Sequence, residues 1–230
     1  KILDVNHALR KKINIININY KFNKPFSNIS DKSNKYIEDC FNLGLKIIKK
    51  NKSIALINGP ISKENFLKKK YPGITEYIAK KTNSKDPVML IYNKKLAVSP
   101  LSTHIPINKV SKFVKKTIII NNVTKINDFY KSKIGKKPKI AVLGLNPHCE
   151  SIDKISEEEK QIIPAIKHLF NNKINIFGPI AADTFFLDKN IRKYDVVIGM
   201  YHDQVLTPAK TLFKFNAINI TIVLPFIKIT

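Results

Sequence analysis

The chain has 230 residues, of which 43% are hydrophobic and 25% are charged, and this composition is typical of a globular protein and excludes wholesale disorder. The formal net charge is +24, but the lysines are spread over the whole chain and arginine occurs only at Arg10 and Arg192, so the pattern favours a solvated lysine surface over a nucleic-acid site. Two cysteines cannot form a disulfide framework and no apolar run approaches the ~20 residues of a membrane span, so we expect a cytoplasmic protein with no membrane or nucleic-acid partner.

The first third of the chain predicts two helices and one strand. Apolar residues recur at helical spacing within Ser30–Lys50, which predicts an amphipathic helix. Ser53–Gly59 is a short apolar run that ends in a turn, and we expect a strand there. The following segment predicts a helix with Pro60 near its start, because proline suits the first turn of a helix.

The middle of the chain predicts a hairpin and then a helix. Val88–Tyr92 and Leu96–His104 are apolar runs separated by a turn-like segment, Asn93–Lys95, so they predict an antiparallel pair. Asn108–Ile118 has a helical pattern. We expect the basic, asparagine-rich segment that follows it, up to Lys139, to be a linker.

The last third alternates strands with a helix. Lys139–His148 predicts a buried strand that runs into a loop, and Glu157–Phe170 predicts a helix with Pro164 at a break or in a first turn. Such alternation predicts the α/β class: a mainly parallel sheet with helices on both faces and some antiparallel pairing. The remaining predicted strands are Ile174–Pro179, Asp195–His202 and Asn216–Pro225.

Three of the five histidines directly follow an apolar run at the carboxyl end of a predicted strand: His104, His148 and His202. In open α/β sheets this edge is where strands distant in sequence deliver side chains to one crevice. Three imidazoles with an open position suit a catalytic divalent metal such as Zn²⁺. The alternative is three unrelated loop histidines. His7 and His168 have helix-like surroundings and are interpreted as structural or surface residues.

Other candidate groups carry a structural alternative as strong as the functional one. Asp203 and Asp183 are the carboxylates that could orient a metal ligand or move a proton, although Asp183 could equally be a helix N-cap. Lys210 could pair with an anionic substrate or be one more surface lysine. Cys149 fits a small inert thiol better than a nucleophile. Neither G-x-G-x-x-G nor a Walker A motif is present, so no standard dinucleotide-binding motif is visible.

Several strings occur together in a specific order and spacing: LSTHIPI, GLNPHCES, GPIAADTFFL, GMYHDQVLTPAK and INITIVLPFIK, with NGPISKENF and PGITEYIA upstream. With these motifs the chain resembles the PdxA family of vitamin B6 biosynthesis, the 4-hydroxythreonine-4-phosphate dehydrogenases, over nearly its whole length. The resemblance implies an isocitrate/isopropylmalate-dehydrogenase-like fold and a homodimer with an interfacial active site. It also implies NAD- or NADP-dependent oxidation of 4-phosphooxy-threonine, followed by decarboxylation to 3-amino-2-oxopropyl phosphate.

The resemblance assigns roles residue by residue. The family's three metal ligands match His104, His148 and His202, with Zn²⁺ expected and Mg²⁺ or Co²⁺ as alternatives, and one histidine is expected to face a partner subunit's pair. Its substrate-binding positions fall on Thr75, Lys210, Asn219 and Lys228.

Departures from the family pattern bear on the substrate. The family has histidine where this chain has Ile74 and arginine where it has Lys228, and the loop after NPH reads CESIDKISEEE in place of a glycine-rich segment. We expect residues 1–230 to be an internal portion of one PdxA-like catalytic unit, without the family's N-terminal segment and C-terminal cofactor-binding end. Alternatives are a dehydrogenase of a related phosphorylated hydroxy acid, such as phosphothreonate or phosphoerythronate, or a non-catalytic basic module.

Overall fold

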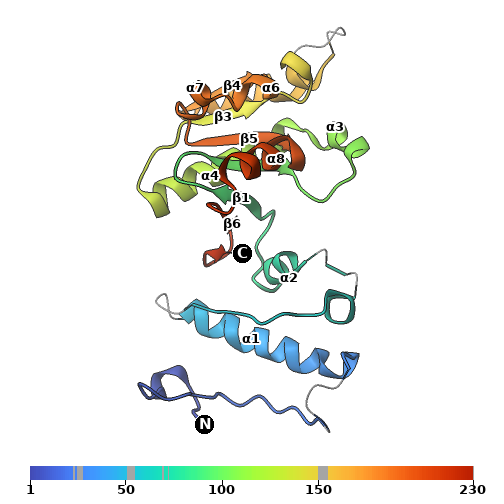
Figure 1. The fold of residues 1–230 in the computed structure, drawn as a ribbon, viewed down its shortest axis with the longest axis vertical. Coiled ribbons are helices and arrows are strands. Elements are labelled where there is room, and N and C mark those ends of the chain that lie inside the picture. Colours follow the sequence, from blue (N-terminus) through green and yellow to red (C-terminus); the bar gives the residue numbers. More distant parts are fainter. Residues whose placement is uncertain are drawn as a thin grey trace. The chain divides into compact units, whose positions relative to one another are not determined.

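Figure 1 shows the fold in a computed structural model, which describes residues 1–22, 24, 28–50, 55–68, 70–71, 73–149 and 155–229. The chain divides into two compact units, Lys1–Lys85 and Asp86–Thr230. None of the helices in these described ranges is both long and apolar enough to cross a membrane.

The first unit is helical. Its longest element is α1 (Asn34–Lys50), which confirms the helix predicted over Ser30–Lys50, and α2 spans Ile74–Lys81. The buried face of α1 includes Phe41, whose ring lies 5.4 Å from the ring of Tyr77 on α2. Burial raises the pKa of Tyr77 to about 12. The shorter helices of this unit are Val5–His7, Asp31–Ser33 and the π-helix Lys63–Leu67.

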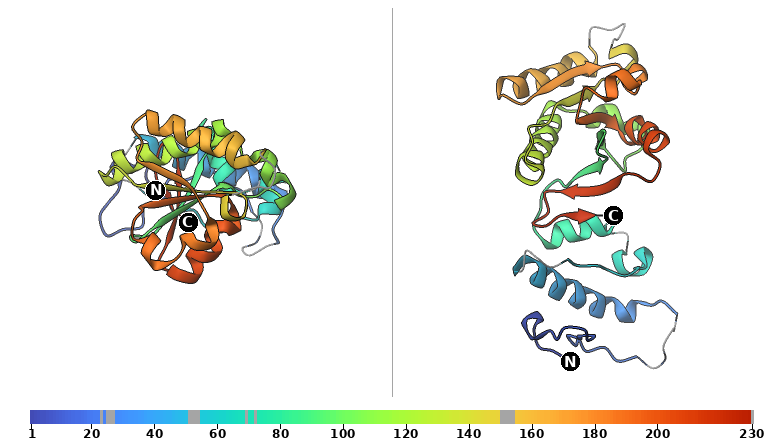
Figure 2. Two further views of the ribbon diagram at one scale, coloured as in Figure 1. Left: turned by 90° about the horizontal axis from the view of Figure 1, so that it is seen from above. Right: turned by 60° about the vertical axis from the view of Figure 1, so that its left-hand side comes forward.

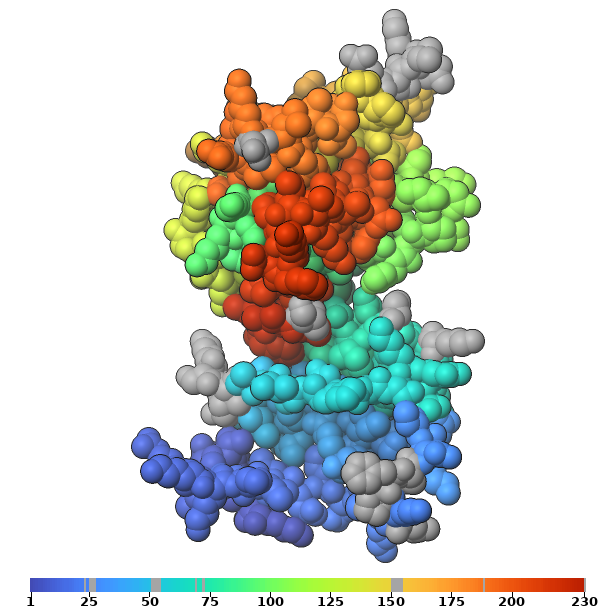
Figure 3. All heavy atoms as spheres, viewed as in Figure 1, coloured from blue at the N-terminus to red at the C-terminus, as the bar shows by residue number. Residues whose placement is uncertain are grey.

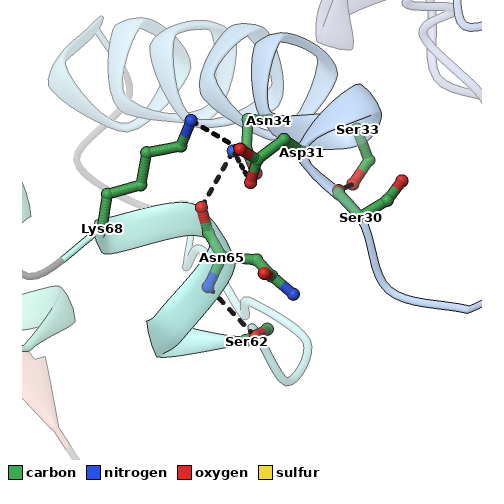
Figure 4. A network of polar contacts seen from close by, with 7 residues as sticks. All are labelled: Ser30, Asp31, Ser33, Asn34, Ser62, Asn65 and Lys68. Carbon is green, nitrogen blue, oxygen red and sulfur yellow. Dashed lines mark hydrogen bonds and ion pairs between the residues drawn. The ribbon is translucent and has the colours of Figure 1, made fainter.

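Polar contacts connect the start of α1 with the π-helix (Figure 4). Asn34 Nδ2 donates to the carbonyl oxygen of Asn65 at 2.9 Å, and Lys68 Nζ lies 2.7 Å from Asp31 Oδ2. Ser62 caps the π-helix by accepting a hydrogen bond from the amide of Asn65. This helix therefore begins after Ser62, later than the start near Pro60 that the sequence predicts.

The strand predicted over Ser53–Gly59 is not found where it can be checked. Residues 51–54 lie outside the described residues, and Ala55–Gly59 forms no strand. A strand needs a hydrogen-bonding neighbour, and in the described part of this unit the chain offers only an isolated bridge between Ile2 and Ile16. The described part of the apolar run, Ala55–Gly59, is exposed.

The second unit is built on a sheet whose strands follow the order β4-β3-β5-β2-β1-β6-β7. Four neighbours, β4, β3, β5 and β2, are parallel, whereas β1, β6 and β7 each pair antiparallel with the preceding strand in that order. This confirms the predicted parallel sheet with some antiparallel pairing, including the hairpin of β1 and β2. The strands are β1 (Val88–Tyr92), β2 (Ala97–Ser102), β3 (Ile140–Leu143), β4 (Ile176–Ile180), β5 (Val196–Tyr201), β6 (Ile218–Ile222) and β7 (Lys228–Ile229).

Helices cover both faces of this sheet (Figure 2). Alternation along the strands assigns side chains to the two faces: Val196 and Ile198 of β5 belong to one core cluster, and Val197 between them belongs to the other. The first cluster packs against α4 and α5, and the second against α6, α7 and α8. The α-helices of this unit are α3 (Val110–Phe113), α4 (Lys116–Phe129), α5 (Ile163–Asn171), α6 (Ala182–Phe185), α7 (Asp188–Ile191) and α8 (His202–Phe213).

The segment expected to link Ile118 to Lys139 is instead helical. It forms α4 and a π-helix, Tyr130–Ile134. Ile119, Val123, Ile126 and Tyr130 recur at the spacing of one helix face and are buried against the sheet, which outweighs the polar, lysine-rich character of the rest. Packing of one apolar face therefore decides the structure here.

Two further predictions are refined in this unit. The predicted strand over Asn216–Pro225 is shorter, because Val223 has a positive φ of 86° and ends β6 at Ile222. Pro164 lies in the first turn of α5, which follows a π-helix, Glu158–Ile162. Among the described lysines only Lys81, Lys125 and Lys228 are not exposed, as a solvated lysine surface predicts.

Candidate metal and substrate site

The three strand-end histidines follow three neighbouring strands. β5 lies between β3 and β2 and is parallel to both, with Ser102 opposite Tyr201 at the carboxyl ends of β2 and β5. His202 directly follows β5, His104 comes shortly after β2, and His148 lies in the loop after β3. The sheet order therefore brings the three segments to one edge.

His104 and His202 line the same hollow, whose volume is about 390 Å³. Each histidine is placed by a regular element, since His104 lies two residues after Ser102, the last residue of β2, and His202 is the first residue of α8. The Ser102 hydroxyl donates to the carbonyl oxygen of Met200 at 2.8 Å and joins the two strand ends. The other lining residues are Ser102, Thr103, Ile105, Ile107, Val110, Tyr201 and Asp203.

Asp203 contacts the ring of His202. Its Oδ1 lies 2.6 Å from His202 Nδ1, and the His202 side chain is 36% exposed. When Nδ1 carries the proton that this carboxylate accepts, the other ring nitrogen, Nε2, is unprotonated and can bind a metal ion. The pair has the arrangement by which carboxylates orient metal-binding histidines.

His148 has a different setting. It lies in a 3₁₀ turn, Pro147–Cys149, with a φ of 56°, in the left-handed region that few non-glycine residues adopt. Its Nδ1 is 3.8 Å from Asp183 Oδ2, and both side chains are largely exposed. The N-cap of α6 is Ala181, so the alternative interpretation of Asp183 as a helix N-cap is wrong. Its carboxylate is instead near the imidazole.

Two residues that the sequence pattern did not single out lie behind the His148 loop. Glu158, which is only 1% exposed, accepts hydrogen bonds from the amides of Leu145 and Asn146 at 2.7 and 2.8 Å and from Asn146 Nδ2 at 2.7 Å. Gln204 accepts from the Met200 amide at 2.7 Å and donates to the Gly144 carbonyl at 2.8 Å. Gln204 is part of the YHDQ string. Glu158 belongs to a run of three glutamates, and the sequence does not indicate which of the three is buried.

The Glu158 carboxylate remains ionised despite its burial. Desolvation acts to raise its pKa, but the hydrogen bonds from Asn146 and Leu145 outweigh it and hold the pKa below its ordinary value of 4.5. The loop segment 150–154, which belongs to the departure from the family pattern, lies outside the described residues.

The four residues that the resemblance assigns to the substrate lie in both units. Thr75 is in the first turn of α2, in the first unit. In the second unit, Lys210 is exposed in the last turn of α8, which forms part of the surface seen in Figure 3, and Lys228 is half-buried on β7. Asn219, opposite Ile91 in the sheet, has a buried Oδ1 with no hydrogen-bond partner among the described residues. Neither Lys210 nor Asn219 lines the hollow at His104 and His202.

The donors near the strand ends suit a divalent metal by type. Imidazole nitrogens bind Zn²⁺ and Co²⁺, and the carboxylates beside His148 and His202 supply the partners that such ligands commonly have. No group of three or more His, Cys, Asp or Glu side chains close enough to hold a metal is present in the described residues.

The fold and the strand ends define a mixed α/β protein with its candidate ligand edge at the carboxyl ends of β3, β5 and β2. Comparison with known families makes this specific. The family model described as pyridoxal phosphate biosynthetic protein PdxA matches residues 2–230, so the chain belongs to the PdxA family, as its motifs predict.

Relatives of known name carry two activities. The chain is 38% identical to 4-hydroxythreonine-4-phosphate dehydrogenase of Sulfurihydrogenibium sp., over 99% of this chain and 71% of the relative. It is 35% identical to the enzyme of the same name from Pseudoalteromonas translucida, over 87% of this chain and 62% of the relative. It is also 38% identical to D-threonate 4-phosphate dehydrogenase of Salmonella typhimurium, over 76% of this chain and 54% of the relative.

Solved structures agree with the fold class. A 4-hydroxythreonine-4-phosphate dehydrogenase from Burkholderia phymatum superposes with a TM-score of 0.82 at 28% identity, covering 100% of this chain and 72% of that one. A structure of a protein described as a putative 4-hydroxythreonine-4-phosphate dehydrogenase from Salmonella typhimurium gives 0.76 at 32% identity, covering 88% and 63%. The chain thus spans less than two thirds of several relatives, and the predicted fold class is confirmed.

Proposed function

We propose that the protein containing this chain is a metal- and NAD(P)-dependent dehydrogenase. It oxidises 4-phosphooxy-L-threonine, and loss of CO₂ then gives 3-amino-2-oxopropyl phosphate in pyridoxal phosphate biosynthesis. The observation that carries the proposal is the delivery of His104, His202 and His148 to one sheet edge by the parallel strands β2, β5 and β3, in a chain of the PdxA family.

His104, His148 and His202 would hold the metal, with Zn²⁺ proposed and Mg²⁺ or Co²⁺ as alternatives. A divalent cation bound there would lower the pKa of the substrate hydroxyl and polarise the ketone, and a nicotinamide cofactor, NAD or NADP, would accept the hydride. Asp203 keeps the Nδ1 proton on His202 and so leaves Nε2 available to ligate. Asp183 Oδ2 lies 3.8 Å from His148 Nδ1, too far for a hydrogen bond, so it would act on His148 through its charge, and being exposed it can also exchange a proton with solvent.

Substrate binding follows from charge and from one buried polar atom. Lys210 and Lys228 supply ammonium groups that attract the phosphate as point charges. Asn219 Oδ1 is buried without a hydrogen-bond partner among the described residues, and a ligand hydroxyl or ammonium would satisfy it. Thr75 is a further candidate for substrate binding through its hydroxyl, on the family resemblance alone.

We further propose a homodimer whose active sites lie between subunits, because the described residues of one chain close no set of three ligands. The two free cysteines, Cys40 and Cys149, fit a reducing, cytoplasmic setting. A subunit-mixing experiment tests the dimer. Proteins carrying His148→Ala and His202→Ala are each expected to be inactive, and mixed dimers are expected to regain one intact site if His148 and His202 of one site come from different subunits. Activity that stays absent in mixed dimers would contradict a site in which His148 and His202 come from different subunits.

The test of the activity is steady-state turnover of the full-length protein. We expect reduction of NAD⁺ or NADP⁺ with 4-phosphooxy-L-threonine, loss of that activity after EDTA treatment, and its return on adding Zn²⁺ or Co²⁺. The matched control is the same assay on His168→Ala, since His168 is exposed on α5, away from the strand ends. No turnover with either cofactor and any of the three metals would contradict the proposal.

A second candidate substrate is D-threonate 4-phosphate. The D-threonate 4-phosphate dehydrogenase of Salmonella typhimurium and the 4-hydroxythreonine-4-phosphate dehydrogenase of Sulfurihydrogenibium sp. are each 38% identical to this chain. In addition, Ile74 stands where the resemblance implies a polar substrate contact. The two substrates differ in the group on the carbon next to the carboxylate, an amine in one and a hydroxyl in the other. The ratio of kcat/KM for the two, measured under the same conditions, decides between them.

A further inference from the structure

We propose that Glu158 and Gln204 are positioning residues, which hold the backbone of Gly144–Asn146 and thereby set the place of His148 in the metal site. The inference rests on the proposed function, because it assigns these two side chains a role in metal binding. Neither residue touches the substrate or the metal in this account. They act through the loop that carries the ligand.

Glu158 fixes the loop from the side of the π-helix. One carboxylate oxygen, Oε1, accepts both the Leu145 and the Asn146 amides, and the other, Oε2, accepts Asn146 Nδ2. An ionised carboxylate can take all three bonds because it has only acceptor sites. All three donors belong to the loop between β3 and His148. The buried charge is therefore directed at the loop rather than at the core of the fold.

Gln204 fixes the same loop from the side of α8. Its amide oxygen accepts the Met200 amide at the end of β5, and its amide nitrogen donates to the Gly144 carbonyl at the end of β3. One side chain thus connects the strand that precedes His202 with the segment that precedes His148. A residue needs both a donor and an acceptor to make this bridge, which a carboxylate cannot do.

Two glycines leave room for these contacts. A Cβ added at Gly144 would lie 2.7 Å from Cys149 Sγ and 3.1 Å from Glu158 Oε1. A Cβ added at Gly199 would lie 2.4 Å from a methyl carbon of Val205 and 3.0 Å from Gln204 Oε1. Any larger residue at either position would displace a group that holds the loop. The absence of a side chain at Gly144, just after β3, and at Gly199 on β5 is thus part of the same arrangement.

The loop needs such support because its backbone is unfavourable. His148 and Cys149 have consecutive positive φ angles of 56° and 60°. A left-handed backbone is unfavourable for residues other than glycine, and it persists only where the surroundings determine the conformation. The hydrogen bonds of Glu158 and Gln204 end at Asn146, directly before the turn that contains both residues. They support this conformation beside two further contacts: the Cys149 amide donates to the Asn146 carbonyl at 3.2 Å, and Asn146 Nδ2 also donates to Glu157 Oε2 at 3.0 Å.

The test uses two variants that differ from the native residues by one atom. In Glu158→Gln an amide nitrogen replaces an acceptor opposite Asn146 Nδ2, so two donors face each other. In Gln204→Glu the bond from the Met200 amide is kept, but a carboxylate oxygen faces the Gly144 carbonyl. Glu159→Gln is the matched control, because Glu159 is exposed on the same π-helix and loses the same charge.

Amide hydrogen exchange of the metal-free, full-length protein reports on the loop itself. We expect the Leu145 and Asn146 amides to exchange at least ~10-fold faster in Glu158→Gln, and unchanged in Glu159→Gln, because their acceptor is weakened only in the first. Far-UV circular dichroism and thermal unfolding confirm that each variant is folded. If Glu158→Gln does not fold, Gln204→Glu tests the support of the loop through its contact with the Gly144 carbonyl.

Titration with Co²⁺, followed by its visible absorption, reports on the ligand. We expect Glu158→Gln and Gln204→Glu to weaken Co²⁺ binding ~10- to 100-fold, which is the usual effect of removing a partner behind a metal ligand, and Glu159→Gln to match the native protein. Native Co²⁺ affinity in both folded variants, with His148→Ala still weakening binding, would overturn the positioning role and leave the proposed metal site intact. Co²⁺ binding that no strand-end histidine affects would instead overturn the proposed function, and the positioning role with it.

Discussion

His202 and His148 reach the same edge of the sheet by different means. His202 is the first residue of α8 and directly follows β5, so two regular elements and their packed cores determine where its backbone lies. His148 lies in an irregular turn with a left-handed backbone, and polar side chains behind the turn hold it. The position of a candidate metal-binding residue on regular elements therefore depends on the apolar core, whereas the position of one on a loop depends on a few buried hydrogen bonds.

The largest expected effect breaks the regular side of this comparison. Gly199→Ala places a Cβ 2.4 Å from a Val205 methyl group, so the start of α8 must move away from β5. Overpacking of this kind costs about 1–3 kcal/mol, and we expect the free energy of unfolding to fall by about 2 kcal/mol in urea denaturation. Gly59→Ala, where a Cβ meets nothing within 4 Å, is the control and is expected to change stability by less than ~0.5 kcal/mol. Native stability in Gly199→Ala would show that α8 accommodates the methyl group.

The next effect concerns the far end of the same helix. Lys210→Ala would remove the proposed charge-assisted contact to the substrate phosphate, so we expect KM to rise at least ~10-fold, or about 1.4 kcal/mol, with a smaller change in kcat. Lys214→Ala is the control, because Lys214 is also exposed and lies just after α8. If both variants keep the native KM, Lys210 is one more surface lysine. Lys228→Arg is expected to lower KM, because a guanidinium can bind phosphate through two parallel hydrogen bonds.

The carboxylates behind the two histidines sharpen the comparison. Asp203 lies 2.6 Å from His202 Nδ1, whereas Asp183 lies 3.8 Å from His148 Nδ1 with both side chains largely exposed. We expect Asp203→Asn to weaken Co²⁺ binding about 10-fold and Asp183→Asn to weaken it less than ~3-fold, since a carboxylate 3.8 Å away makes no hydrogen bond to the ring. Isothermal titration calorimetry with Co²⁺ gives both values. A larger loss of Co²⁺ affinity in Asp183→Asn than in Asp203→Asn would mean that His148, not His202, depends on its carboxylate.

The smallest effect is a pH dependence on the loop side. The folded-state pKa of Glu158 is lower than its ordinary value of 4.5, so folding favours the ionised carboxylate. Its contribution is therefore fully present above pH 4.5 and is lost as the pH falls from 4.5 through the lower folded-state value. We expect the difference in unfolding free energy between the native protein and Glu158→Gln to narrow over that range. A difference that stays constant from pH 6 down to pH 3 would contradict it.

The sequence predicted the sheet better than the helices. Apolar runs such as Val196–Tyr201 occur in strands buried on both faces, and their order in the chain was enough to expect a parallel arrangement. The expectation of a linker after Ile118 failed at residues 119–129 of α4, where a buried apolar face is interrupted in sequence by asparagine and lysine. There, tertiary packing decided the structure, and local composition gave the wrong expectation.

The candidate site divides in the same way. His104, His148 and His202 could be singled out because each follows an apolar run, and a position at a strand end is visible in the sequence. Glu158 could not be singled out, because its neighbours Glu157 and Glu159 have the same side chain and only the fold buries one of the three. The candidate metal-binding histidines were thus easier to predict from the sequence than Glu158, which is proposed to hold a loop in place.

The most direct test of the central claim is a Co²⁺ titration of the full-length protein beside its single-histidine variants, followed by visible absorption. We expect one Co²⁺ per chain, with at least ~100-fold weaker binding in His104→Ala, His148→Ala and His202→Ala. His168→Ala, which removes an exposed histidine from α5, is expected to bind as the native protein does. Co²⁺ binding that is equal in all four variants would contradict a metal site at the carboxyl ends of β2, β3 and β5.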